Sequence, residues 1–186
     1  MTRCNKAAAG RRTPKVLLLA LLLICTSCTQ KPATLPQTAA SSPSPNASAS
    51  PFPQRVGLVN DFANAFNPSQ EKTLDSMLTQ MKSDVDVEFV VVTIDSTNGQ
   101  PLFDYSLGLA RQWAPGGDSG RGLVLTLAIK DREWRLQVSK ELEKDLPDDV
   151  CLSLAEPAEN LYRQEKYAEG VQAYVRAISD RLKAKH

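Results

Sequence analysis

The chain has 186 residues, a formal net charge of +1, four Cys and one His. Because that His is the terminal His186, the sequence excludes a Ser-His-Asp triad, a Cys-His nucleophile, a two-His zinc site and a His-ligated haem. A charge so close to zero also argues against a nucleic-acid partner, which selects for an excess of Lys and Arg.

The first 27 residues are predicted to be a secretory signal peptide. Residues 1–15 contain basic residues and no acidic ones, and residues 16–25 form an apolar run. Such a run is too short for a membrane-spanning helix, which needs about 20 residues, but is typical of a signal peptide. Removal of residues 1–27 leaves 17 of the 22 basic residues and all 21 acidic ones, so the mature charge is −4.

Cys28 is the predicted lipidation site and the first residue of the mature protein. Thr26 and Ser27 precede it, and together the three resemble a bacterial lipobox, although Cys25 stands where that motif usually has Leu. The alternative is an ordinary cleaved signal with a freely diffusing product. Thr29 replaces the Asp that often retains lipoproteins in the inner membrane. We therefore expect a periplasm-facing lipoprotein of the bacterial cell envelope, with the outer membrane slightly favoured.

Residues 28–54 are predicted to form a disordered tether. The segment is rich in Pro, Ser and Ala and carries a single charge, Lys31. It has too little apolar surface to offset the entropy of ordering. Residues 55–186 then have the size of one domain with its own core. Cys151 lies among apolar residues in that domain and is interpreted as a small buried side chain rather than a nucleophile.

The first half of this domain alternates helix and strand. Asn67 and Gln70 around Pro68 predict a capped helix start, and apolar residues recur at helical spacing after it. Residues 87–94 form a β-branched apolar run typical of a strand covered on both faces. Residues 101–113 then read as a second helix, followed by a glycine-rich loop over residues 114–122.

The second half begins with a hairpin. Residues 123–129 predict another buried strand, and the strict alternation over residues 133–138 predicts a half-exposed one. An acid-rich loop over residues 140–149 leads to a helix that Pro157 is expected to interrupt. A last helix begins near Lys166. Helices that flank a small mixed sheet containing a hairpin predict an α/β fold, a three-layer αβα sandwich.

Several short motifs occur in order along this domain: Val59–Asn64 (VNDFAN), Val90–Thr93, Asp104-Tyr105 with Trp113, Gly120–Ala128, Asp131–Val138, Leu142-Glu143 with Leu146–Asp148, and Tyr167–Gly170. In this order and spacing they resemble the TPM domains of thylakoid-lumen, photosystem-repair and bacterial envelope proteins. Together they cover about residues 56–184. The resemblance implies a Rossmann-like fold, and activities described as acid phosphatase, calcium binding or assembly of membrane complexes.

One stretch departs from the family pattern. Where many relatives have two glycines around a Tyr, this chain has Ser139–Lys144 (SKELEK), which lacks the conformational freedom of glycine. If those glycines shape a metal or phosphate pocket, that pocket is altered here. The departure therefore weighs against an inherited phosphatase activity.

Carboxylates on loops are the candidate ligands of a hard cation. Oxygen ligands suit calcium or magnesium, and the resemblance favours Asp61, Asp118 and Glu143 as the residues facing the cleft. The alternative is that these acids lie on solvated faces. In the glycine loop, Ser119 and Arg121 are candidates for holding an anion, and a plain flexible connector is the alternative.

Three functions stay open from the sequence. The first is a membrane-tethered binding module for envelope or membrane proteins in assembly, repair or quality control. The second is a divalent-metal-dependent phosphatase, and the third is a calcium-binding module without turnover. No motif for nicotinamide, flavin, haem or zinc is present.

Overall fold

The computed structural model describes residues 2–4 and 51–185. The predicted lipid site Cys28, nearly all of the predicted signal peptide and most of the predicted tether lie outside these residues. Within the described residues, no helix combines the length and apolar character needed to cross a membrane.

Five strands form one mixed sheet in the order β1-β5-β4-β3-β2. The strands are β1 (Thr2–Cys4), β2 (Val59–Asp61), β3 (Glu88–Ile94), β4 (Gly122–Ala128) and β5 (Glu133–Val138). β2, β3 and β4 are parallel, whereas β5 runs antiparallel to β4 and β1 antiparallel to β5. The predicted hairpin is confirmed, but β1 and β2 are strands that the sequence patterns did not predict.

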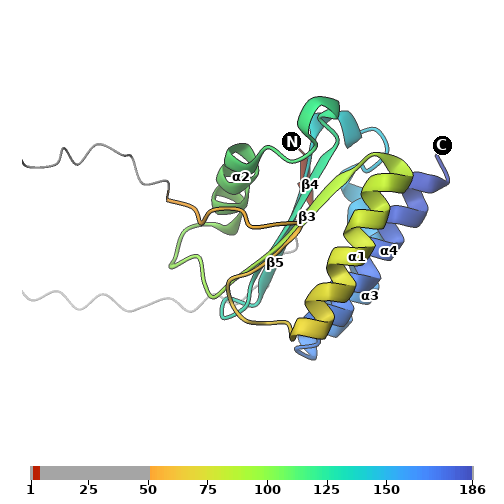
Figure 1. The fold of residues 1–186 in the computed structure, drawn as a ribbon. Coiled ribbons are helices and arrows are strands. Elements are labelled where there is room, and N and C mark those ends of the chain that lie inside the picture. Colours follow the sequence, from red (N-terminus) through yellow and green to blue (C-terminus); the bar gives the residue numbers. More distant parts are fainter. Residues whose placement is uncertain (1, 5–50, 186) are drawn as a thin grey trace, which may run out of the picture. The chain divides into compact units, whose positions relative to one another are not determined.

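Helices cover both faces of the sheet, which confirms the predicted αβα sandwich. α2 (Leu102–Trp113) lies on one face, and α1 (Pro68–Val85), α3 (Asp148–Arg163) and α4 (Tyr167–Lys183) lie on the other (Figure 1). Each face has its own core, because residues of the central strands point alternately to the two sides.

The start of α1 follows the prediction from sequence. The Asn67 side chain accepts a hydrogen bond from the Gln70 backbone N–H, and the Gln70 side chain accepts one from the Asn67 N–H, both at 2.9 Å. This capping box satisfies two amides that the helix cannot pair internally. The buried residues Leu74, Leu78 and Met81 turn one face of α1 toward the sheet.

The prediction of a half-exposed β5 was wrong. Its polar residues Arg135 and Gln137 are only 2% and 1% exposed, because α2 packs against β4 and β5. The Gln137 amide donates to the Ser106 hydroxyl of α2 at 2.7 Å. The Arg135 guanidinium lies 4.5 Å from the centre of the Phe103 ring. The alternation of polar and apolar residues identified the two faces of β5, but it did not reveal that α2 covers the polar face.

The predicted interruption at Pro157 was also wrong, since α3 continues through that residue to Arg163. Proline inside a helix removes one hydrogen bond and costs about 3 kcal/mol. The packing of α3 on α4 offsets this cost. Cys151 of α3 is fully buried, as predicted, and its carbonyl accepts a hydrogen bond from the Tyr174 hydroxyl of α4 at 3.1 Å.

After β1, the folded unit resumes at Phe52, three residues before residue 55, the boundary expected from composition. The Phe52 ring stands edge-on to Tyr105 of α2, with ring centres 5.2 Å apart. Trp113 at the end of α2 donates its indole N–H to the Pro53 carbonyl at 3.0 Å. A ring contact and a hydrogen bond with α2 therefore hold residues 52 and 53, which were predicted to belong to the tether because the segment is rich in proline.

Candidate functional site

Asn60 and Asp61, the polar centre of the VNDFAN motif, hold the chain on either side of β2. The buried Asn60 side chain accepts a hydrogen bond from the Val56 N–H at 2.7 Å and donates one to the Gly57 carbonyl at 3.0 Å. This pairing fixes the segment that enters β2. The Asn of the motif is therefore accounted for by a structural role.

The Asp61 carboxylate closes the loop between β2 and α1. One oxygen accepts a hydrogen bond from the Ala65 N–H at 2.9 Å, and the other accepts one from the Phe66 N–H at 2.8 Å. The Thr93 hydroxyl at the end of β3 also donates to this carboxylate. Both oxygens thus already serve donors of the protein, so a cation at Asp61 would have to compete with them.

The glycine loop after α2 is a tightly folded connector. Gly116 and Gly120 adopt positive φ angles of 98° and 64°, which favour glycine. A Cβ on Gly122 would lie 2.1 Å from the Pro115 carbonyl oxygen, so the backbones are too close for any side chain. Close packing and left-handed geometry therefore account for these glycines without a phosphate.

Three further candidates, Asp118, Ser119 and Arg121, lie in the glycine loop. The Ser119 hydroxyl donates to the Gly116 carbonyl at 2.9 Å and so takes part in the turn itself. Asp118 belongs to a short 3-10 helix and is exposed, and Arg121 follows that helix. Anion binding by Ser119 and Arg121 stays a prediction, and the Ser119 hydroxyl is already engaged in the turn.

The proposed metal ligands Asp61, Asp118 and Glu143 do not converge. Asp61 ends β2 and pairs in register with Thr93 near the carboxyl end of β3. Asp118 precedes β4, and Glu143 follows β5, at the opposite end of the sheet. Strands rise about 3.3 Å per residue, which puts roughly 15–20 Å between the two ends. The residues that the structure describes contain no group of three or more His, Cys, Asp or Glu that could hold a metal ion.

The stretch that departs from the family pattern, Ser139–Lys144, contains a short 3-10 helix, Lys140–Leu142. Ser139, which directly follows β5, is hydrogen-bonded to the first residue of β4. Its N–H donates to the Gly122 carbonyl at 3.0 Å, and its hydroxyl accepts a hydrogen bond from the Gly122 N–H at 3.1 Å. The Glu141 side chain lies over Gly120, where an added Cβ would approach its carboxyl carbon to 3.1 Å. Side chains of this stretch therefore pack against the glycine loop.

Glu88 at the start of β3 organises the charges near the glycine loop. Its carboxylate accepts a hydrogen bond from the Gly116 N–H at 2.8 Å and forms an ion pair with Arg55. Lys82 of α1 lies 3.8 Å away. Burial raises the pKa of the Glu88 carboxyl, but the bonds from Arg55 and Gly116 outweigh it and hold that pKa below its ordinary value. The cluster joins residue 55, α1, β3 and the loop.

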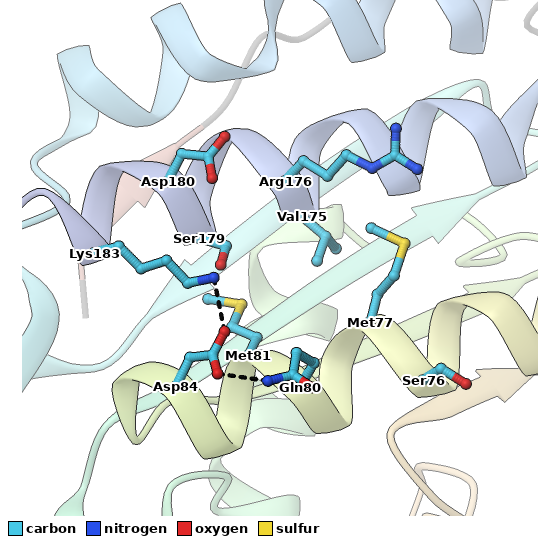
Figure 2. Close-up of a pocket in the computed structure, with 10 residues that line it drawn as sticks. All are labelled: Ser76, Met77, Gln80, Met81, Asp84, Val175, Arg176, Ser179, Asp180 and Lys183. Carbon is cyan, nitrogen blue, oxygen red and sulfur yellow. Dashed lines mark hydrogen bonds and ion pairs between the residues drawn. The ribbon is translucent and has the colours of Figure 1, made fainter.

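An open groove with a volume of about 350 Å³ lies between α1 and α4 (Figure 2). Met77 and Met81 of α1 and Val175 of α4 supply its apolar floor. Polar and charged side chains surround them: Ser76, Gln80, Asp84, Arg176, Ser179, Asp180 and Lys183. An apolar floor within a polar rim is typical of a surface that binds a ligand or a partner.

One end of the groove is closed by an ion pair between the two helices. Lys183 of α4 reaches across to Asp84 of α1 at 2.7 Å, and Gln80 donates to the same carboxylate at 2.5 Å (Figure 2). The hydrogen bond from Lys183 lowers the pKa of Asp84, and the bond to Asp84 raises the pKa of Lys183. Both groups therefore stay charged over a wide range around neutral pH.

The sequence patterns did not reveal this groove. The helical spacing of Met77 in the apolar stripe of α1 predicts a core residue, but Met77 is only half-buried in the structure. A residue on the border of a helical stripe is the sole signal that the sequence offered. Its neighbour across the groove comes from α4, almost 100 residues later along the chain.

The comparisons with known proteins identify the family. The family model described as the TPM domain matches residues 59–181. The chain belongs to the TPM-domain family. The resemblance of the short motifs is thereby confirmed over nearly the whole folded domain.

Among curated proteins, the UPF0603 protein YdjH of Bacillus subtilis (strain 168) is 23% identical over 117 residues. The match spans 63% of this chain but only 44% of that relative. The chain therefore corresponds to less than half of the longer protein.

Three solved bacterial protein structures share the fold. The N-terminal domain of a protein from P. gingivalis is 33% identical, with a TM-score of 0.63, over 69% of this chain and 83% of that one. The N-terminal domain of the cg2496 protein of Corynebacterium glutamicum is 18% identical, with a TM-score of 0.55, over 72% and 84% of the two chains. The BA42 protein of Bizionia argentinensis is 13% identical, with a TM-score of 0.58, over 66% and 85%.

Proposed function

We propose that this TPM domain is a lipid-anchored binding module of the bacterial cell envelope, which contacts other envelope or membrane proteins in their assembly, repair or quality control. Cys28 would carry the lipid, and residues 29–51 would link it to the folded head on the periplasmic side. The outer membrane is the favoured location, because Asp does not follow Cys28.

The observation that carries the proposal is the groove between α1 and α4. Methionine side chains are flexible and polarisable, and they adapt to differently shaped apolar partners. Met77 and Met81 lie side by side on its floor, and the charged residues at its rim can fix the orientation of a partner. A groove of this kind suits an apolar side chain of another protein better than a phosphate ester.

Photo-crosslinking of the membrane-anchored protein tests the binding role. A crosslinkable amino acid at Met77 should give a discrete adduct with a membrane or envelope protein. The same amino acid at the exposed Thr79, which lies on α1 outside the groove, is the matched control. Equal adducts from both positions, or none from Met77, would contradict the proposal.

A metal-dependent phosphatase is the second candidate, and the name of the matched family model, TPM_phosphatase, favours it. Calcium or magnesium would then be the cofactor, and p-nitrophenyl phosphate is a suitable probe. Turnover that depends on either metal and disappears in Asp118→Ala would replace the binding role with catalysis. Thermal stabilisation by calcium without turnover would instead favour a calcium-binding module.

The lipid anchor has its own test. Labelling with a palmitate analogue should modify the protein and should be lost in Cys28→Ala. Label that is unchanged in this variant would remove the anchor from the proposal and leave the groove to be judged separately.

A further inference from the structure

Removal of the predicted signal peptide would expose one edge of the sheet, along β5. β1 (Thr2–Cys4) is the outermost strand next to β5, and it pairs with Leu136, Gln137 and Val138. β1 falls within residues 1–27, the predicted signal peptide, which would be cleaved off to leave Cys28 as the first residue of the mature protein. In the mature protein β5 would then be the edge strand.

The backbone groups that this edge would expose follow from strand geometry. The N–H and C=O groups of successive residues in a strand point alternately to its two neighbours. The Ser139 N–H points to β4, since it donates to the Gly122 carbonyl. Alternation then directs the backbone groups of Val138, Leu136 and Trp134 away from β4, toward the place that β1 occupies. The groups of Gln137 and Arg135 point to β4.

We infer that the β5 edge of the processed protein binds an extended segment of an envelope protein, which adds to the sheet as an antiparallel strand in place of β1. This inference deepens the proposed function and rests on the removal of residues 1–27. Strand addition of this kind obtains affinity from main-chain hydrogen bonds and specificity from alternate side chains. The register of β1 shows that the edge accommodates a strand in this direction.

The side chains of β5 define the chemistry of the added segment. Residues directly opposite each other in an antiparallel pair point to the same face. Opposite Leu136 and Val138, whose side chains belong to the core under α3 and α4, the segment needs apolar residues. Opposite Arg135, a buried cation on the α2 face, an acidic residue is favoured by charge.

A second copy of this chain is a poorer occupant than such a segment. Antiparallel pairing of β5 with itself would bring two Arg135 guanidinium groups close together on one face of the sheet. Like charges in such positions destabilise a strand pair.

The sequence of β5 does not protect its edge against an added strand. It has no Pro or Lys, two of the residues that commonly protect exposed edges from other strands.

Amide hydrogen exchange of β5 tests the inference. The processed chain is compared with the full chain of residues 1–186, synthesised without membranes so that residues 1–27 stay attached. In the processed chain the amides of Trp134, Leu136 and Val138 should exchange at least about tenfold faster than those of Arg135 and Gln137. In the full chain the amides of Leu136 and Val138 should be slow as well, since β1 remains on the edge.

Two synthetic peptides then probe the chemistry of the edge. An eight-residue peptide that alternates Val and Glu should slow the three outward amides by at least about tenfold at saturation. A peptide that alternates Val and Lys is the matched control and should bind more weakly. Val138→Pro, which removes one outward N–H and leaves the β4 pairing intact, should weaken the Glu peptide at least about fivefold.

Four results would overturn the inference. Mass spectrometry could show that residues 1–27 stay attached, in which case β1 keeps the edge. The three outward amides could be slow in the processed chain without peptide. Slow amides together with a dimeric mass would assign the edge to a second copy. Equal effects of the two peptides would refute the stated chemistry. None of these results depends on crosslinking at Met77, so the groove can fail or stand independently.

Discussion

Replacement of Asp61 by Ala separates a structural carboxylate from a metal ligand. In the structure this carboxylate receives the N–H groups of Ala65 and Phe66 and the hydroxyl of Thr93. A hydrogen bond to a charged group contributes about 1.5–3 kcal/mol. Water can replace part of this where the loop meets solvent, so we expect Asp61→Ala to lower the free energy of unfolding by about 2–4 kcal/mol.

The assay is thermal unfolding of the purified protein without added metal. For a domain of this size, 1 kcal/mol shifts the melting temperature by roughly 3–5 °C, so Asp61→Ala should melt about 10 °C below the parent. Asp118→Ala is the matched control, because Asp118 is exposed on the glycine loop. It should change stability by less than about 0.5 kcal/mol.

A melting temperature of Asp61→Ala within about 1 °C of the parent would refute the reasoning, because the three bonds would then contribute nothing. A loss of stability that appears only when calcium is present would also refute it. In that case the carboxylate would act through a bound cation rather than through the loop.

Three further changes test other parts of the structure. Gly122→Ala should destabilise the domain by about 3 kcal/mol in urea unfolding, because its Cβ would lie 2.1 Å from the Pro115 carbonyl oxygen; an unchanged midpoint would contradict this close approach. Tyr162→Phe should stabilise the domain by up to about 1 kcal/mol, since it removes a buried hydroxyl with no hydrogen-bond partner among the described residues; a clear loss of stability would reveal a partner. The pKa of Glu88 lies below its ordinary value of 4.5, so its contribution is present above that pH and is lost as the pH falls through the lowered pKa. Glu88→Gln should therefore be less stable than the parent at pH 7 and should lose less stability between about pH 5 and 3, and parallel pH profiles would disprove the ion pair with Arg55.

Local patterns determined most of the elements of this protein. The capping box at Asn67 and the apolar runs that became β3 and β4 are properties of neighbouring residues, so the sequence contained them completely. The same holds for the family, whose short motifs keep their order and spacing over residues 59–181. A helix start or a buried strand needs only a few consecutive side chains of the right kind.

Only the tertiary structure decided what the individual side chains do. Arg135 looks exposed from alternation but is buried by α2, and α3 passes through Pro157 because α4 supports it. Asp61 and Glu143 look like two ligands of one site but lie at opposite ends of the sheet. Burial and convergence depend on residues far apart in the chain, whereas composition and spacing record only local order.

The sequence has a nearly neutral charge and one His, at its last position, so the side chains available for chemistry are carboxylates, hydroxyls and Lys, with backbone groups or a hard cation beside them. The fold adds what the residue list does not contain: a methionine groove between two helices, and a strand edge paired with the first residues of the chain. Both features join segments that are more than 90 residues apart, and packing between such segments is a property of the folded state alone.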